Sequence, residues 1–105
     1  MEIGELNKRV ELQHLAENKD DFGEMIRSYA PYAKVWAKIE PLQGRELEHA
    51  QQISTETTHR VTIRYKANVA SEHRVIYKER IFEIEVPLNP GERNEYLVLM
   101  CKEIS

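Results

Sequence analysis

Hydrophobic and polar residues alternate along most of this chain, which is the pattern of strands that bury one face. Between residues 34 and 39, apolar side chains at positions 35, 37 and 39 alternate with Lys34, Trp36 and Lys38. Successive side chains of a strand point to opposite faces, and branched or aromatic residues favour strands. The same alternation predicts strands near residues 8–15, 33–40, 57–66, 73–78, 81–87 and 94–102.

The alternation also predicts which side chains form the core. The inward residues of the fifth strand are expected to be Phe82, Ile84 and Val86. The last strand is almost continuously apolar, so we expect both of its faces to be buried. Tyr65 and Tyr77 alternate with basic neighbours and are therefore expected in the core. Trp36 shares a face with two lysines. It is either a core residue at a kink of its strand or a contact residue.

One segment interrupts the alternation. Residues 42–54 are mostly Gln, Glu, Leu, His and Ala, which are largely good helix formers. Apolar residues recur there at positions 47, 50 and 53, as a narrow helical stripe. Pro41 suits the start of a helix, whereas Gly44 weakens it. The segment predicts a helix within 42–54, with a loop that becomes helical from Arg45 as the alternative.

Turn residues separate the predicted strands. The segment 18–23 is a loop in which Gly23 can adopt a positive φ. The short link 78–80 predicts a hairpin, and the sequence Asn-Pro-Gly at 89–91 predicts a turn before the last strand. These elements indicate a mainly β fold and a single domain over residues 1–105. We expect a small six-stranded barrel or sandwich with one inserted α-helix.

Composition narrows the class of protein further. Hydrophobic residues make up 41% and charged residues 31% of the 105 residues, as in globular proteins. The net charge of −3 argues against a dedicated nucleic-acid binder. No apolar run is long enough for a membrane span, and the amino terminus does not resemble a signal peptide. The single cysteine, Cys101, has no partner for a disulfide, so we expect synthesis in a cytosol.

The charges are unevenly spread. Acidic residues dominate from 40 to 56 and from 83 to 103. Basic residues dominate from 60 to 80: Arg60, Arg64, Lys66, Arg74, Lys78 and Arg80. This basic set is either a solvated strand face or a surface that meets a complementary surface of another protein.

No pattern of catalytic or metal-binding residues is visible. The Asp-Phe-Gly triplet at 21–23 lacks the other motifs of a kinase, and we interpret it as a turn. The four histidines lack zinc-type spacing. The Glu-x-x-His pairs at 46–49 and 56–59 lack the further helices that a di-iron site needs. We therefore expect no enzyme, no metal and no cofactor. The alternatives are a small nucleic-acid-binding barrel and, third, a small-molecule or metal-binding domain.

Particular strings of residues carry more information than the pattern does. They are 4–13, the triplet at 21–23, Val35-Trp-Ala-Lys-Ile-Glu-Pro-Leu-Gln-Gly-Arg-Glu46, 59–65, 74–77, 80–84 and 95–101. In this order they resemble the phage head–tail joining family, the adaptors or stoppers of the neck of long-tailed phages. The chain departs from that family where the family often has glycines, at Gly23-Glu24 and in the hairpin 78–80.

The resemblance implies a structural subunit of the phage neck that joins the DNA-filled capsid to the tail and can gate the DNA channel. Its partners would be like subunits in a ring, a portal-side connector and a tail-side protein, with DNA passing without sequence-specific binding. The protein would be assembled in the cytoplasm of the bacterial host, and its final place would be the virion.

The resemblance also associates the insertion after the Pro-Leu turn, residues 41–55, with the DNA channel. The candidate channel and assembly residues are Glu40, Arg45, Glu46 and Glu48. Acidic side chains would repel the phosphates of passing DNA. The basic residues of 60–80 are the candidate face toward a neighbouring subunit. Adaptor and stopper roles, and an active phage and a prophage, remain open at this point.

Overall fold

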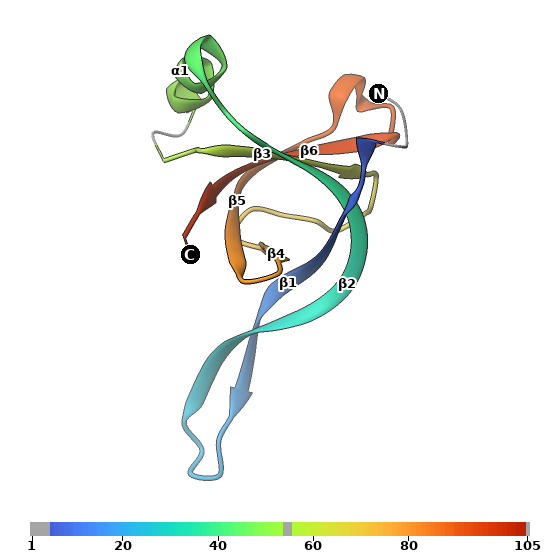
Figure 1. Ribbon diagram of the computed structural model, residues 1–105. Coiled ribbons are helices and arrows are strands. Elements are labelled where there is room, and N and C mark those ends of the chain that lie inside the picture. Colours follow the sequence, from blue (N-terminus) through green and yellow to red (C-terminus); the bar gives the residue numbers. More distant parts are fainter. Residues whose placement is uncertain (1–4, 54–55, 105) are drawn as a thin grey trace.

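Antiparallel strands form a closed barrel. The structure, a computed structural model, describes residues 5–53 and 56–104, apart from the side chain of Ile53. In these residues, six strands close in the order β1-β2-β3-β6-β5-β4 (Figure 1). The elements are β1 (Lys8–Lys19), β2 (Met25–Pro41), α1 (Gly44–Ile53), β3 (His59–Arg64), β4 (Arg74–Tyr77), β5 (Arg80–Leu88), the short 3-10 turn η2 (Pro90–Glu92) and β6 (Tyr96–Glu103). The prediction of a small barrel with one inserted helix is confirmed.

The core fills the inside of the barrel with alternate side chains of every strand. Phe82 is its largest member and is completely buried. The other members of the cluster are Val10, Leu12, Ala37, Val61, Ile63, Val75, Ile84, Leu97, Leu99 and Cys101. Burying one large apolar side chain contributes about 1.5–3 kcal/mol. This cluster therefore holds the fold together without a disulfide.

A bulge changes the direction of side chains in β5. The pairing of β5 with β6 shifts between Ile84 and Val86, so that Val86 pairs with Met100. Paired residues share one face of a sheet, and Met100 lies between the inward Leu99 and Cys101. Val86 therefore faces outward and is half-buried. The prediction that Val86 points inward is wrong because the extra residue of a bulge reverses the alternation.

Two further expectations about burial are wrong. In β6, half-buried residues alternate with buried ones, so its outer face is not part of a core. Tyr65 is 40% exposed because β3 ends at Arg64 and the alternation stops there. Tyr77 does pack against the core, as predicted. Trp36 is 52% exposed on the outer face of β2, which excludes a core position.

The first two strands extend well beyond the barrel. They pair with each other from Lys8–Ala37 in the barrel to Lys19–Met25 beside the turn, whereas β1 pairs with β4 only at residues 11–13. Residues 14–30 therefore form a projecting hairpin, called the arm below, and it gives the molecule a long axis of 50 Å (Figure 1). Tyr29 anchors the base of the arm, because the guanidinium of Arg74 lies 3.8 Å from its ring centroid. The strand predictions 8–15 and 33–40 found only the barrel part of this hairpin.

The predicted helix is present, and it begins as the alternative expected. Gly44 is the first residue of α1 but has a φ of +57°, so right-handed helical backbone starts at Arg45. Ala50 is buried and Leu47 is half-buried, as the apolar stripe predicted, while the side chain of Ile53 lies outside the described residues. The helix stands at the end of the molecule opposite to the arm (Figure 1). Within the described residues, no helix is long and apolar enough to cross a membrane.

Candidate assembly surfaces

Charged side chains tie α1 to the barrel. Glu40 of β2 and Arg60 of β3 are paired across the strands, with 3.3 Å between Oε1 and Nε. Arg60 also lies 3.6 Å from Glu46 of α1. Burial alone would raise the pKa of Glu40, but the hydrogen bond and charge of Arg60, with the charge of Lys38, lower it. Two of the candidate channel acids, Glu40 and Glu46, are thus paired with a member of the basic set inside one subunit.

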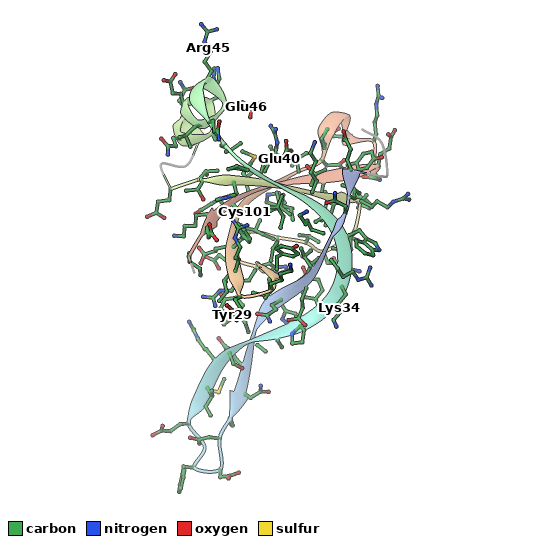
Figure 2. The ribbon with its side chains drawn as sticks, in the orientation of Figure 1. Tyr29, Lys34, Glu40, Arg45, Glu46 and Cys101 are labelled. Atoms are coloured by element: carbon green, nitrogen blue, oxygen red, sulfur yellow. The ribbon has the colours of Figure 1, made fainter. Side chains whose placement is uncertain are left out.

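Arg45 and Glu48 have no such pairing. Both are exposed on α1, and neither makes an ion pair in the part of the chain that the structure describes. Figure 2 shows Arg45 pointing away from the barrel, with Glu46 and Glu40 closer to it. The segment after β2 therefore presents one free acid and one free base rather than a strongly acidic wall.

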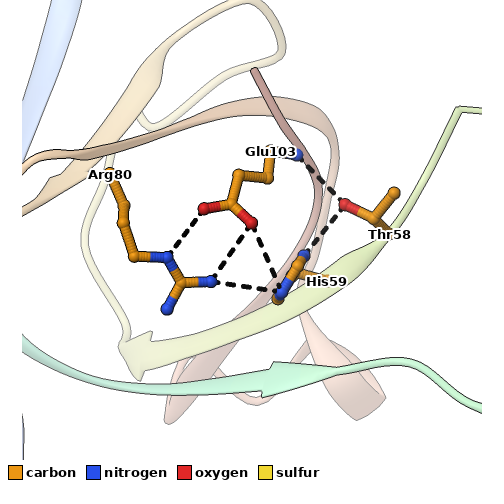
Figure 3. A network of polar contacts seen from close by, with 4 residues as sticks. All are labelled: Thr58, His59, Arg80 and Glu103. Atoms are coloured by element: carbon orange, nitrogen blue, oxygen red, sulfur yellow. Dashed lines mark hydrogen bonds and ion pairs between the residues drawn. The ribbon is translucent and has the colours of Figure 1, made fainter. Parts of the chain in front are cut away.

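Arg80 belongs to a network that closes one end of the barrel. Its Nε lies 2.7 Å from Oε2 of Glu103 (Figure 3). The guanidinium lies over the ring of Phe82, 4.8 Å from its centroid. His59 joins through Arg80 Nη2 at 3.4 Å, and Thr58 Oγ1 accepts a hydrogen bond from the backbone N–H of Glu103. The hydrogen bond from Arg80 lowers the pKa of Glu103. Arg80 therefore has a structural role over the core.

The basic set does not form one continuous face. Arg60 and Arg80 pair with acidic residues, and Arg74 stacks on Tyr29 at the base of the arm. Lys78 lies over the ring of Tyr77 at 5.3 Å. Arg64 and Lys66 remain, and they line a different surface. We grouped these six residues in the sequence analysis only because they lie in one segment of the chain, residues 60–80.

A groove on the outer wall gathers aromatic and basic side chains from three separate segments. It has a volume of about 570 Å³ and is called the Trp36 groove below. Its lining residues are Leu6, Arg9, Val35, Trp36, Arg64, Tyr65 and Lys66. The guanidinium of Arg9 lies 5.2 Å from the Trp36 ring, and the two residues are paired across β1 and β2. Sequence reasoning missed Arg9, although its position opposite Trp36 could have been found from the pairing of the two predicted strands.

The other end of the barrel carries a cluster of rings. Nδ1 of His73 lies 2.8 Å from the hydroxyl of Tyr32 and 3.4 Å from the backbone nitrogen of Ala70, so it accepts both hydrogen bonds when unprotonated. The ring of His14 lies 6.2 Å from that of His73. Burial lowers the pKa of His73, and the charge of His14 lowers it further. Burial also raises the pKa of Tyr32, which keeps its hydroxyl a donor.

No group of three or more His, Cys, Asp or Glu among the described residues could hold a metal ion. Cys101 is fully buried, as predicted, and its thiol donates to the carbonyl of Leu99. Burial, helped by the charge of Glu85, raises the pKa of this thiol. Its position among apolar side chains makes it part of the core.

Comparison with known proteins then decides the family. The model of the phage head completion protein family matches residues 1–104. This chain belongs to that family. The family is one of phage structural proteins, so the protein is a structural component of the virion that contacts other virion proteins in joining head and tail. The resemblance to a head–tail joining family is confirmed.

Two solved structures have a similar fold. The chain is similar to the solution structure of protein SF1141 from Shigella flexneri 2a, with a TM-score of 0.81 and 25% identity over 98% of this chain and 96% of that one. It is also similar to a chain of the virion of a native gene transfer agent particle, with a TM-score of 0.60 and 17% identity over 93% and 94% of the two chains. The second likeness shows a shared fold. A search among curated protein sequences finds no match.

The buried histidines of this head completion protein predict a loss of stability in mild acid. Burial lowers the pKa of both His59 and His73 below the ordinary value of 6.5. The unfolded chain therefore binds more protons than the folded chain as the pH falls below that value. The contribution of these two histidines to stability is complete above a pH of about 6.5 and is lost as the pH falls toward their lower pKa values in the folded chain. Thermal unfolding followed by circular dichroism at several pH values should show a falling midpoint.

His73→Gln should weaken this dependence on pH, because one of the two groups that resist protonation is removed. His49→Gln, at an exposed position of α1, is the matched control and should leave the dependence unchanged. Equal dependence on pH in the wild type and in His73→Gln would contradict the prediction.

Proposed function

We propose that this head completion protein forms a closed ring in the phage neck, between the portal end of the filled capsid and the tail. The observation that carries the proposal is the family match over residues 1–104 on a barrel with protruding elements at both ends. The arm and α1 each expose side chains that have no role in the core of their own subunit. Ring symmetry needs two different faces on one subunit, and the exposed end of the arm can supply one of them.

The neighbours in this arrangement are like subunits, a portal-side connector protein and a tail-side protein. The DNA passes through the ring without sequence-specific binding, and the ring is assembled in the cytoplasm of the bacterial host. The proposal is tested by deleting the gene from the phage or prophage that carries it and imaging the particles. A failure to join filled heads to tails is the expected result.

We also propose that α1 faces the DNA channel and gates it. The support is the position of α1, which stands away from the barrel with few buried side chains, and the free charges of Arg45 and Glu48. Glu40 and Glu46 would act mainly by fixing the helix to Arg60. Acidic groups beside a channel repel phosphates and so keep passing DNA from binding.

Neutralising the charges of α1 should harm assembly and spare folding. The change is Arg45→Gln, Glu46→Gln and Glu48→Gln together. Exposed substitutions change the free energy of unfolding by less than about 0.5 kcal/mol each, so thermal unfolding should barely move. Complementation of a phage that lacks the gene should yield few infectious particles, with DNA leaking from filled heads.

Glu79→Gln is the control for this experiment, because Glu79 is an exposed acid in the turn between β4 and β5. It should support normal yields. Fully infectious particles from the triple variant would show that α1 is only a surface helix. The assignment to the neck would survive that result, but the channel role would not.

The second candidate function is a nucleic-acid-binding barrel. The observation in its favour is the Trp36 groove, because exposed aromatic rings beside basic side chains can stack on single-stranded bases. The net charge of −3 opposes it, since affinity for nucleic acid depends on neutralising phosphates.

A further inference from the structure

The tip of the arm exposes apolar side chains that its own subunit does not use. Phe22 is 92% exposed, Met25 57% and Ile26 46%. Each of these side chains lies at or next to the turn between β1 and β2. Large apolar side chains gathered on a protrusion mark a contact site more often than they mark a solvated surface. We therefore expect the tip of the arm to contact another protein surface.

The turn that carries Phe22 is held in one shape. Oδ1 of Asp20 accepts hydrogen bonds from the backbone N–H groups of Phe22 and Glu24, both at 2.8 Å. Asp20 and Glu24 also pair through their backbones at 2.9 Å. Gly23 has a φ of +82°, which favours glycine there. Phe22 is thus presented by an ordered turn, and docking it would cost little conformational entropy.

The Trp36 groove offers apolar and aromatic surface to such a tip. Leu6, buried, forms an apolar part of the lining, and the exposed rings of Trp36 and Tyr65 form the walls. Its volume of about 570 Å³ is ample for a phenylalanine side chain with its neighbours. Aromatic rings prefer offset or edge-to-face contacts with other rings, which Trp36 and Tyr65 could offer to Phe22.

The charges of the two surfaces are also complementary. The tip carries the acids Asp20, Asp21 and Glu24 against the single base Lys19. The groove is lined by Arg9, Arg64 and Lys66, and none of its described lining residues is acidic. In the residues that the structure describes, these three bases make no ion pair. Opposite charges around an apolar anchor favour one orientation of the contact.

The two surfaces cannot meet within one subunit. Lys19, the last residue of β1, lies roughly 33 Å beyond Arg9 along that strand, at about 3.3 Å per residue, and Phe22 follows in the turn. The arm projects from the barrel at the end opposite to α1 (Figure 1), whereas the groove is lined by residues 6–9, 35–36 and 64–66. Tyr29, stacked on Arg74, holds the base of the arm in that direction. The tip that fits the groove must therefore come from another copy of the chain.

We propose that the Phe22 tip of one subunit docks into the Trp36 groove of the next. The contact joins two different surfaces, so each subunit offers one tip and one groove. Repeated around an axis, such head-to-tail contacts close into a ring. This inference rests on the proposed ring in the neck and names the surfaces that make it.

The experiment uses complementation of a phage that lacks the gene, with four variants. Phe22→Ala removes the anchor. The double change Asp21→Lys with Glu24→Lys reverses the tip, and Arg64→Glu with Lys66→Glu reverses the groove. The fourth variant carries all four reversals. Each of the first three should lower the yield of infectious particles by roughly tenfold or more, as is usual when an anchoring residue of an interface is lost. The fourth should recover most of that loss.

Folding of each variant is checked separately by thermal unfolding. The midpoint should stay unchanged, because the substituted residues 21, 22, 24, 64 and 66 are exposed or half-buried. A photo-crosslinking phenylalanine analogue at position 22 identifies the partner. The expected adduct joins two copies of this chain, with the attachment at Trp36 or Tyr65. Gln52, exposed on α1, is the control position and should give no such adduct.

Three results would overturn the contact. They are full yields from Phe22→Ala, no recovery in the fourfold variant, and an adduct with a different virion protein. Retention on single-stranded DNA is measured for the wild type and for all variants. If the wild type shows salt-sensitive retention and only the groove variant loses it, the groove is instead assigned to nucleic acid. In each case, the proposed function in the neck would still hold if deletion of the whole gene blocks the joining of heads and tails.

Discussion

Replacing Phe82 by alanine should lower the free energy of unfolding by about 3–5 kcal/mol, the usual cost of truncating a buried aromatic residue. Phe82 is fully buried and is the largest side chain of the core cluster. Its ring also contacts the edge of His59 at 5.1 Å and lies under the guanidinium of Arg80. The substitution would leave a cavity and would loosen the network that closes this end of the barrel. Urea or guanidinium unfolding at equilibrium measures the loss.

Phe22→Ala is the matched control for that prediction, since it makes the same chemical change at a side chain that is 92% exposed. It should change the free energy of unfolding by less than about 0.5 kcal/mol. Similar losses from the two substitutions would contradict the placement of Phe82 in the core. A native domain has a stability of only about 5–15 kcal/mol, so the Phe82 variant is expected to lose a substantial part of it.

The barrel could be predicted from the sequence because its strands are half-buried. Where one face packs inside and the other meets water, side chains must alternate with a period of two. The strands 74–77 and 96–103 follow that rule. The helix was also predictable, since residues 42–54 are mostly helix formers with an apolar stripe at positions 47, 50 and 53.

The arm could not be predicted in the same way. Its residues have water on both sides, and backbone pairing between β1 and β2 holds it, with no core behind it. No alternation is needed there. The bulge beside Val86 was not predicted for another reason. It depends on the register between β5 and β6, and no local sequence pattern indicates it. Tyr65 was misplaced because its strand ends two residues earlier than expected.

The candidate site illustrates the limit of reading charge along the chain. The basic residues from 60 to 80 were grouped by sequence, yet the fold gives Arg60 and Arg80 acidic partners. It then brings Arg9, from a distant segment, beside Arg64 and Trp36. Such a surface exists only when the strand order of the closed barrel is known. The family resemblance, in contrast, could be found from the sequence, since it depends on motifs in their order.

Deleting the gene from its phage or prophage should abolish infectious particles while sparing both halves of the virion. In the proposed arrangement the protein lies between the filled capsid and the tail, so packaging of DNA and tail assembly should each proceed without it. The physical reason is geometric. Without the ring, neither the portal end of the head nor the upper end of the tail has its complementary surface. Supplying the wild-type gene from a plasmid should restore infectivity.

Electron microscopy of the particles made by the deletion strain is the measurement that tests this account most directly. The account predicts DNA-filled heads and complete tails as separate particles. It also predicts joined particles when the wild-type gene is supplied, with this protein present in the purified virions at the neck. Joined, infectious particles in the absence of the gene would contradict the central claim, as would a purified virion that contains no copy of this chain.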